Sequence, residues 1–159
     1  MLLLPEASSI GVIADTHGLM RPAALAALEG SDLIIHAGDV GKREILDSLA
    51  WIAPVVVVRG NVDRARWAEA LPERAVVVAS GRQILVLHDR QALKDKPERG
   101  DYDAVVAGHS HRPHVERENG VLFFNPGSAG PRRFTLPVCV GRLRVTPDQL
   151  EAEVIELPG

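Results

Sequence analysis

The sequence has a single cysteine, Cys139, among its 159 residues. One cysteine can form neither an intrachain disulfide nor a metal cage of thiolates. The lack of a disulfide framework favours a reducing compartment, so we expect a cytoplasmic protein. The first residues, Met-Leu-Leu-Leu-Pro-Glu, have no basic segment and too short an apolar run for a secretory signal.

Long apolar runs and aromatic residues are also scarce. No run approaches the roughly 20 apolar residues that a membrane-spanning helix needs, so no membrane partner is expected. Two Trp, one Tyr and three Phe leave most of the packing to aliphatic side chains. Hydrophobic residues nevertheless make up 46% of the chain, which suffices for the core of a single domain over residues 1–159.

Positive charge is not in excess. Lys and Arg number 18 against 21 Asp and Glu, which gives a net charge of −3. A broad nucleic-acid-binding surface is therefore not expected. The motif Gly-x-x-x-x-Gly-Lys-Ser/Thr is absent, which excludes a P-loop nucleoside triphosphatase.

The first half of the chain alternates β-branched apolar runs with helical patterns. We expect strands at 8–14, 32–37 and 54–59, and helices at 21–29, 44–51 and 65–71. This β-α-β-α-β order implies parallel strands joined by right-handed crossovers.

The second half is mostly β. Strands are expected at 76–79, 83–87, 104–107, 121–124, 134–145 and 150–157. The charged stretch 90–101 is expected to be a short helix or a surface loop. The whole pattern favours the α/β class, as a two-sheet β-sandwich flanked by helices in αββα order.

Polar residues follow five of these strands at the point where each ends. They are Asp15 and His17, Asp39, Asn61, His88, and finally His109 and His111. From one group to the next the separation is 21 to 27 residues, about one strand and its crossover. Each group should therefore lie at the carboxyl end of its strand, where such sheets bind ligands.

Each of these residues has an ordinary explanation when taken alone. Asp15 and Asp39 could cap helices, Asn61 could hold a turn, and His88 could be a hydrogen-bonded core histidine. Seven such donors at strand ends are poorly explained by coincidence. Carboxylate, amide and imidazole donors without sulfur suit Mn²⁺, Fe, Zn²⁺, Co²⁺ or Ni²⁺. Seven are too many for one tetrahedral ion, whereas two ions sharing a carboxylate would use them well.

In this order the motifs resemble the signature of the calcineurin-like metallophosphoesterases. The motifs are Asp15-x-His17, Gly38-Asp39, Gly60-Asn61, His88 and Gly108-His109-Ser110-His111. Gly-Asn-x-Asp and Asn125-Pro126-Gly127-Ser128 are similar to the small single-domain YfcE-type branch. The resemblance runs from about residue 10 to residue 133.

The resemblance implies the αββα fold and two divalent metal ions, Mn first, with Fe, Zn, Ni or Co as alternatives. It assigns the ligands as Asp15, His17 and His111 for one ion, Asn61, His88 and His109 for the other, and Asp39 as the bridge. It also implies in-line attack on a small phosphoester by a hydroxide held between the ions, with Asp39, Asn61 and His109 acting through the metals.

Residues 62 and 63 determine whether the chain can supply a proton to the leaving group. Many members of the superfamily have a His directly after the Asn ligand as proton donor, and this chain has Val62 there. Without that acid, diesters and good leaving groups are favoured, so we expect a phosphodiesterase. Asp63 could donate a proton, or it could fix its loop by hydrogen bonds to backbone.

Several assignments stay open at this point. Asp89 could orient a ligand imidazole or be a turn residue. Arg112, Arg132 and Arg133 lie near the expected rim and could bind phosphate. His36 is expected to be a hydrogen-bonded core residue. The alternative functions are a phosphomonoesterase or nucleotide phosphatase of the same superfamily, and a non-catalytic interaction scaffold with the same fold; a homo-oligomer is compatible with all of them.

Overall fold

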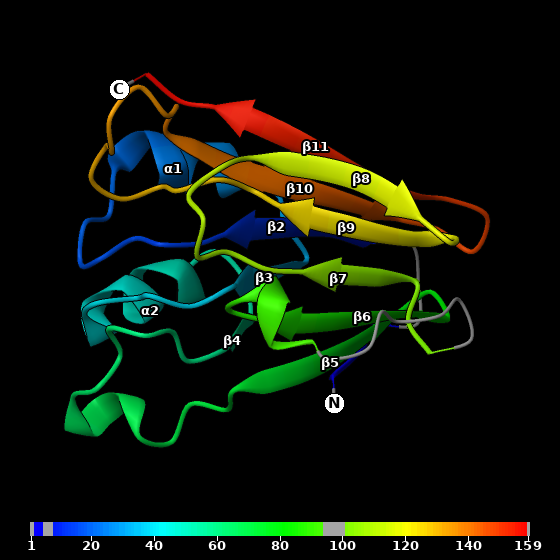
Figure 1. Cartoon of the computed structure of the whole chain (residues 1–159), viewed down its shortest axis with the longest axis horizontal. Coiled ribbons are helices and arrows are strands. Elements are labelled where there is room, and N and C mark those ends of the chain that lie inside the picture. The colour runs from blue at the N-terminus through cyan, green and yellow to red at the C-terminus, as the bar shows by residue number, and fades with distance from the viewer. Residues whose placement is uncertain (1, 5–7, 94–100, 159) are drawn as a thin grey trace.

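A computed structural model describes residues 2–4, 8–93 and 101–158. These residues form two sheets, of six and five strands, that pack face to face (Figure 1). The expected two-sheet sandwich is confirmed. No helix in the described ranges is long and apolar enough to cross a lipid bilayer.

The five-stranded sheet has the order β11-β10-β2-β3-β4. Its strands are β2 (Ser8–Ile13), β3 (Leu33–His36), β4 (Val55–Val57), β10 (Cys139–Val145) and β11 (Leu150–Glu156). As the β-α-β pattern predicts, β2, β3 and β4 run parallel. The antiparallel strand β10 joins β2 to β11.

The six-stranded sheet has the order β1-β5-β6-β7-β9-β8. Its strands are β1 (Leu2–Leu4), β5 (Arg74–Ala79), β6 (Arg82–Leu87), β7 (Ala104–Val106), β8 (His114–Glu118) and β9 (Val121–Asn125). The predicted hairpin of β5 and β6 is present, and β6, β7 and β9 run parallel.

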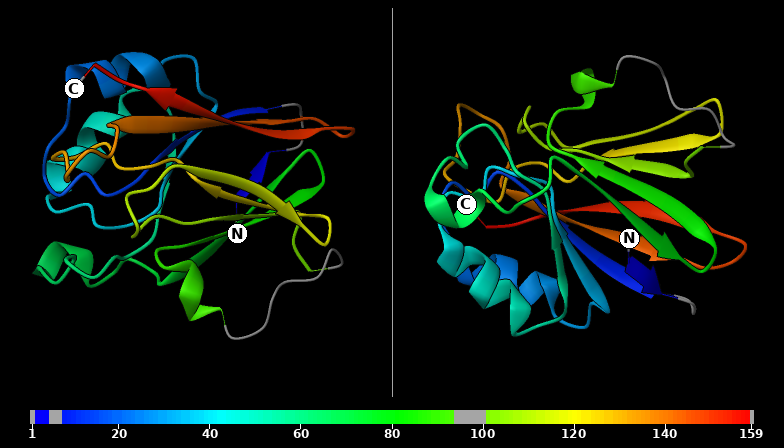
Figure 2. Two further views of the ribbon diagram at one scale, coloured as in Figure 1. Left: turned by 45° about the horizontal axis from the view of Figure 1, so that its top comes forward. Right: turned by 90° about the horizontal axis from the view of Figure 1, so that it is seen from below.

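Two helices cover the outer face of the five-stranded sheet (Figure 2). Helix α1 spans Pro22–Leu28 and begins with proline, whose fixed φ suits the first helical position. Helix α2 spans Arg43–Ala50. Both bury an apolar stripe in the same cluster as β2 and β3, whose members include Leu28, Leu49 and Ile34.

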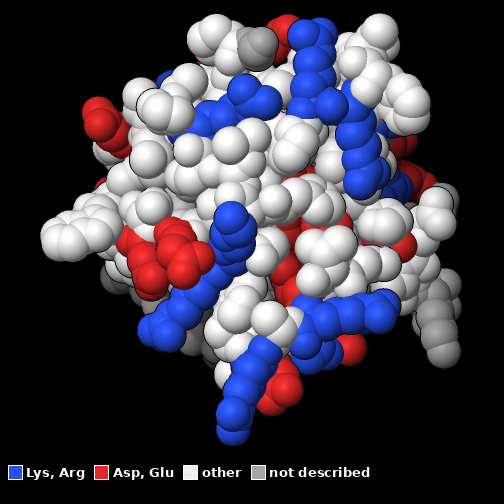
Figure 3. All heavy atoms as spheres, turned by 90° about the vertical axis from the view of Figure 1, so that its left-hand side faces the viewer, with Lys and Arg blue, Asp and Glu red and all other residues white. Residues whose placement is uncertain are grey.

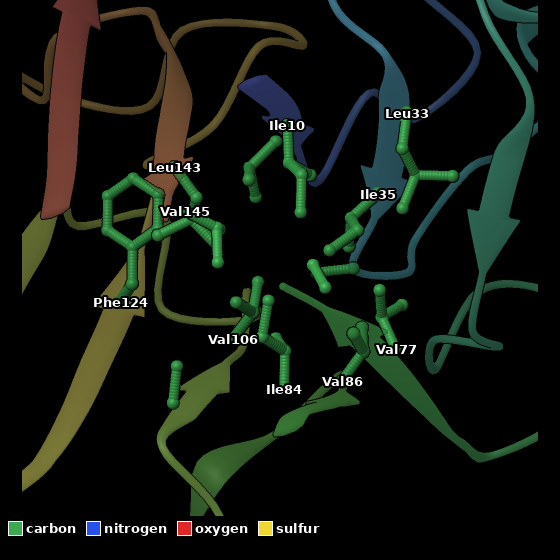
Figure 4. Packing of buried hydrophobic residues seen from close by; sticks show 14 of the residues in the cluster. Ile10, Leu33, Ile35, Val77, Ile84, Val86, Val106, Phe124, Leu143 and Val145 are labelled. Carbon is green, nitrogen blue, oxygen red and sulfur yellow. The ribbon is translucent and has the colours of Figure 1, made fainter. Parts of the chain in front are cut away.

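The main core lies between the two sheets. In Figure 4, Ile10 and Ile35 of the five-stranded sheet face Val86 and Val106 of the six-stranded sheet. All four side chains are fully buried. Burial of a side chain of this size contributes about 1.5–3 kcal/mol, so this layer fixes how the strand ends of the two sheets meet.

Three sequence expectations differ from the structure. The helix expected at 65–71 is only a 3₁₀ turn, η1 (Arg66–Ala68), because an isolated two-turn helix before Pro72 is marginal. The strand expected at 134–145 begins at Cys139, since Pro137 lacks the N–H that a ladder needs. The edge strands β1 and β8 were not expected, because one is very short and the other is charged. The stretch 90–101 was expected to be a short helix or a loop and contains the short turn η2 (Arg90–Ala92), while residues 94–100 lie outside the described residues.

Candidate metal centre

Two loops at the carboxyl ends of β2 and β3 are joined by backbone hydrogen bonds. The Asp15 N–H donates to the Gly38 carbonyl at 3.0 Å, and the His17 N–H donates to the Asp39 carbonyl at 3.0 Å. These bonds continue the pairing of β2 and β3 beyond the sheet. Asp15, His17 and Asp39 are therefore held by backbone before any side-chain contact is made.

Five of the seven expected ligand residues have left-handed backbone. The φ angles are 55° for Asp15, 47° for His17, 56° for Asp39, 72° for His109 and 62° for His111. Non-glycine residues adopt this region rarely and at a cost, and such residues gather at functional sites. These five residues, with their conformational cost, all lie in loops that follow the strands β2, β3 and β7.

The side chains of five expected ligands converge. Nε2 of His17 lies 3.6 Å from Oδ2 of Asp39, and Nε2 of His111 lies 3.8 Å from Oδ1 of Asp15. Nε2 of His88 lies 3.3 Å from Asp39 and 3.9 Å from Asp15. Two groups have ligand atoms close enough to share an ion: Asp15, His17 and His111, and Asp15, Asp39 and His88.

The two remaining expected ligands lie beside this cluster. The His109 N–H donates to Oδ2 of Asp15 at 3.1 Å, and its ring centroid is 5.2 Å from that of His88. Asn61 is exposed and lines a hollow of about 300 Å³ together with His88. The structure thus places all seven at one end of the sandwich, three chain segments from one sheet and two from the other.

Unpaired polar atoms are concentrated in this cluster. Within the described ranges, five buried side-chain nitrogen or oxygen atoms have no hydrogen-bond partner, and four belong here: Asp15 Oδ1, His17 Nε2, His88 Nε2 and His111 Nδ1. A buried polar atom without a partner costs about 1–3 kcal/mol. Carboxylate oxygen and imidazole nitrogen are ligands of divalent transition metals. The donor set therefore fits bound cations.

The two carboxylates of the cluster differ in acidity. Burial raises the pKa of Asp15 from 3.8 to about 7. Burial also acts on Asp39, but the contact with His88, the hydrogen bond from the Val62 N–H and the nearby imidazoles bring its pKa down to about 2. A divalent cation would supply the opposite charge that keeps both carboxylates ionised.

Burial determines the direction of the pKa shift at two of the imidazoles. Burial lowers the pKa of His17, and it lowers the pKa of His111 to about 4. Both rings are therefore neutral at pH 7, the form that binds metals. His88 is oriented by the Ala37 carbonyl, which lies 2.8 Å from its Nδ1, so that Nε2 faces the carboxylates.

Residues behind the cluster hold it in place. The ring of His36 accepts a hydrogen bond from the Gly38 N–H and contacts the hydroxyl of Thr16, which donates to the Val40 carbonyl. Burial lowers the pKa of His36 to about 4, as suits a neutral core histidine. The Asn125 amide donates to the Gly108 carbonyl and accepts from the Gly127 N–H, which fixes the loop before His109.

The Asp63 carboxylate is hydrogen-bonded to the backbone of its own loop and of the loop after β3. It is buried, and its two oxygens accept hydrogen bonds from the N–H groups of Val40, Gly41 and Gly60 at 2.9–3.2 Å. This arrangement favours the loop-fixing role over proton donation.

Glycine is required where two loops touch. A Cβ added to Gly60 would lie 2.1 Å from the Asp39 nitrogen and 2.2 Å from its Oδ1, and one added to Gly38 would lie 2.6 Å from Nδ1 of His88. The glycines that precede two expected ligands thus let those ligands approach. The sequence motifs Gly-Asp and Gly-Asn indicated these glycine positions. They did not indicate which loop each glycine contacts.

Positive charge surrounds the cluster. Figure 3 views the side on which β2, β6, β7 and β9 end: carboxylates lie recessed near the middle, and Lys and Arg side chains lie around them. Burial has the largest effect on the pKa values of Asp15, His17 and His111, and the positive charge of Arg133 acts on all three in the lowering direction. Arg132 instead donates to the Leu136 carbonyl at the same rim.

Known proteins are similar in sequence to most of this chain. The family model described as the calcineurin-like phosphoesterase superfamily domain matches residues 9–148. A probable metallophosphoesterase of Methanocaldococcus jannaschii is 35% identical, over 93% of this chain and 81% of that protein. The phosphodiesterase YfcE of Escherichia coli is 27% identical, over 81% of this chain and 83% of that protein.

A solved structure shares the fold. Vacuolar protein sorting 29 from Cryptosporidium parvum superposes with a TM-score of 0.82 at 23% identity, covering 96% of this chain and 93% of that one. At this identity the likeness concerns the fold.

Proposed function

Because the chain belongs to the calcineurin-like phosphoesterase superfamily, we propose that it is a phosphodiesterase that depends on two divalent metal ions, Mn²⁺ first among them. The observation that carries this proposal is the buried cluster of unpaired ligand atoms on Asp15, His17, His88 and His111. Relatives named as metallophosphoesterase and phosphodiesterase support it.

The residues divide between two ions. Asp15, His17 and His111 would hold one, Asn61, His88 and His109 the other, and Asp39 would be shared between them. When bound, the ions supply a nucleophilic hydroxide at neutral pH and neutralise charge on the phosphoryl oxygens. The chain itself holds the ligands in left-handed loops, and the positive charge of Arg133 near Asp15, His17 and His111 attracts an anionic ester.

The reaction would be hydrolysis with water as co-substrate. A new P–O bond forms to water oxygen, the ester P–O bond breaks, and the leaving oxygen takes the electron pair and a proton. Val62 is exposed beside the cluster and has no proton to give, and Asp63 is occupied by backbone N–H groups. A leaving group that departs without an acid is therefore preferred, which favours activated diesters.

Turnover of a matched ester pair tests this proposal. Protein treated with EDTA and reloaded with Mn²⁺ should hydrolyse bis(p-nitrophenyl) phosphate faster than p-nitrophenyl phosphate. Asp39→Asn should lower this rate at least about a hundredfold. Asp47→Asn changes an exposed residue of α2, is the matched control, and should retain the wild-type rate of diester hydrolysis. A faster monoester rate would favour the phosphomonoesterase instead.

A non-catalytic interaction scaffold is the second candidate. Three large apolar side chains near the cluster are exposed: Leu19 at 39%, Val62 at 48% and Phe134 at 93%. Such side chains suit a protein partner, and the vacuolar sorting protein shares the fold. This candidate predicts that no phosphoester, mono or di, is turned over by fully metal-loaded protein.

A further inference from the structure

A second hollow lies beside the candidate metal centre, and the proposed reaction has not used it. It has a volume of about 600 Å³, within the range of small-molecule sites. Its apolar lining includes Val105, Ala107, Phe123, Leu136 and Pro137. An apolar group of similar size would bind favourably in this pocket, because binding removes its apolar surface from water.

The floor of this pocket is the outer face of the six-stranded sheet. Side chains alternate along a strand, so Val105 and Phe123 face away from the core that Val106 and Phe124 fill. Figure 4 shows Val106 and Phe124 on the inner side, between the sheets. The pocket and the core thus lie on opposite sides of β7 and β9.

The pocket reaches the metal centre at His109. Its lining includes Gly108, His109 and Ser110, the segment that follows β7. On one side the His109 ring contacts that of His88, and on the other its Nε2 lies 3.8 Å from Oδ2 of Asp89 in the pocket wall. The His109 imidazole, itself a candidate ligand, therefore lies between His88 and the apolar hollow.

The two arginines of the pocket have different surroundings. The guanidinium of Arg90 lies 3.8 Å from the centroid of the Phe123 ring and pairs with Glu116 at 3.7 Å and Glu118 at 3.3 Å. The two glutamates balance the charge of Arg90, and its planar guanidinium forms one wall of the pocket. Arg112 is exposed and has no carboxylate partner among the described residues, so it can face an anion at the mouth.

From these observations we infer that the pocket receives an aromatic ester group of the phosphoester substrate, with the phosphoryl group at the His109 end. The inference rests on the proposed function and adds the class of substrate: an ester with a flat aromatic group, such as an aryl or nucleobase-bearing ester. A substrate with only small alkyl groups would leave most of the volume of this hollow unfilled.

Binding of two phosphonates that differ only in the group on phosphorus tests this. Calorimetry on the Mn²⁺-loaded protein should give phenylphosphonate a dissociation constant at least about tenfold lower than that of methylphosphonate, since one added apolar group in such a pocket is worth that factor or more. Leu136→Trp fills the pocket and should reduce the difference to less than about twofold. Ala26→Trp adds the same ring on the exposed face of α1 and should keep the wild-type ratio. Leu136→Phe is the milder variant if Leu136→Trp fails to fold by circular dichroism.

The outcomes separate this inference from the proposed function. Equal affinity for the two phosphonates in the wild-type protein overturns the pocket inference and leaves the metal-dependent phosphoryl site standing. A phenyl preference that survives in folded Leu136→Trp overturns it as well. Failure of both phosphonates to bind metal-loaded protein contradicts the phosphoryl site itself, and the pocket inference falls with it.

Discussion

Nε2 of His88 lies 3.3 Å from Oδ2 of Asp39, and this contact joins the two sheets. His88 follows β6 of the six-stranded sheet, whereas Asp39 follows β3 of the five-stranded sheet. Neither sheet alone supplies the cluster. The packing of Ile10 and Ile35 against Val86 and Val106 therefore decides whether the two halves of the site meet.

Gly60 tests the close approach of the two loops. Gly60→Ala would place a Cβ about 2 Å from the Asp39 backbone, so we expect the Asp39 carboxylate to shift and metal affinity to fall by at least about tenfold. Gly30→Ala is the control, because its Cβ meets nothing within 4 Å and only the left-handed φ costs stability, about 1 kcal/mol. Calorimetric titration with Mn²⁺ on both variants measures the difference. Equal affinities would contradict the assigned role of Asp39.

Asp63 distinguishes loop support from proton transfer. Asp63→Ala would leave three N–H groups without their acceptor, so we expect a loss of about 3 kcal/mol in the free energy of unfolding. Urea denaturation of the metal-free protein measures this. If Asp63 were instead the proton donor, Asp63→Asn would retain stability and lose activity selectively toward esters with poor leaving groups.

Asp15 should destabilise the metal-free fold at neutral pH. Its pKa is raised by burial from 3.8 to about 7, so folding binds a proton that the unfolded chain gives up, and the resulting penalty grows as the pH rises from about 4 to about 7. Asp15→Asn should therefore stabilise EDTA-treated protein at pH 8 by an amount on the order of 2 kcal/mol, and should stabilise it less at pH 5. Thermal denaturation at the two pH values measures both. A gain that is independent of pH would show that the carboxyl is not the cause.

The sequence predicted the parts of the fold that rest on local patterns. The β-branched runs at 8–14 and 32–37 mark parallel strands because both faces of such strands are buried. Edge strand β8 lacks that signal, since four of its five residues are charged or polar and most are exposed. Its place in the sheet depends on pairing with β9, which is a tertiary contact.

The sequence allowed the candidate site residues to be named, but it did not predict their exposure or their contacts. The motifs brought out the seven expected ligands because each follows a strand. They gave no sign that Asn61 would be exposed while Asp15 is buried, nor that Arg90 would stack on Phe123. These features come from the packing of loops that lie far apart in the chain. The cytoplasmic location and the single-domain boundary stay predictions.

The central claim is that buried polar side chains from both sheets bind a pair of cations. Metal analysis of the purified protein after incubation with Mn²⁺ and removal of the free ion tests it most directly. We expect the wild-type protein to retain close to two ions per chain, Asp39→Asn to retain one or fewer, and Asp47→Asn to retain two. A wild-type protein that retains no metal would contradict it.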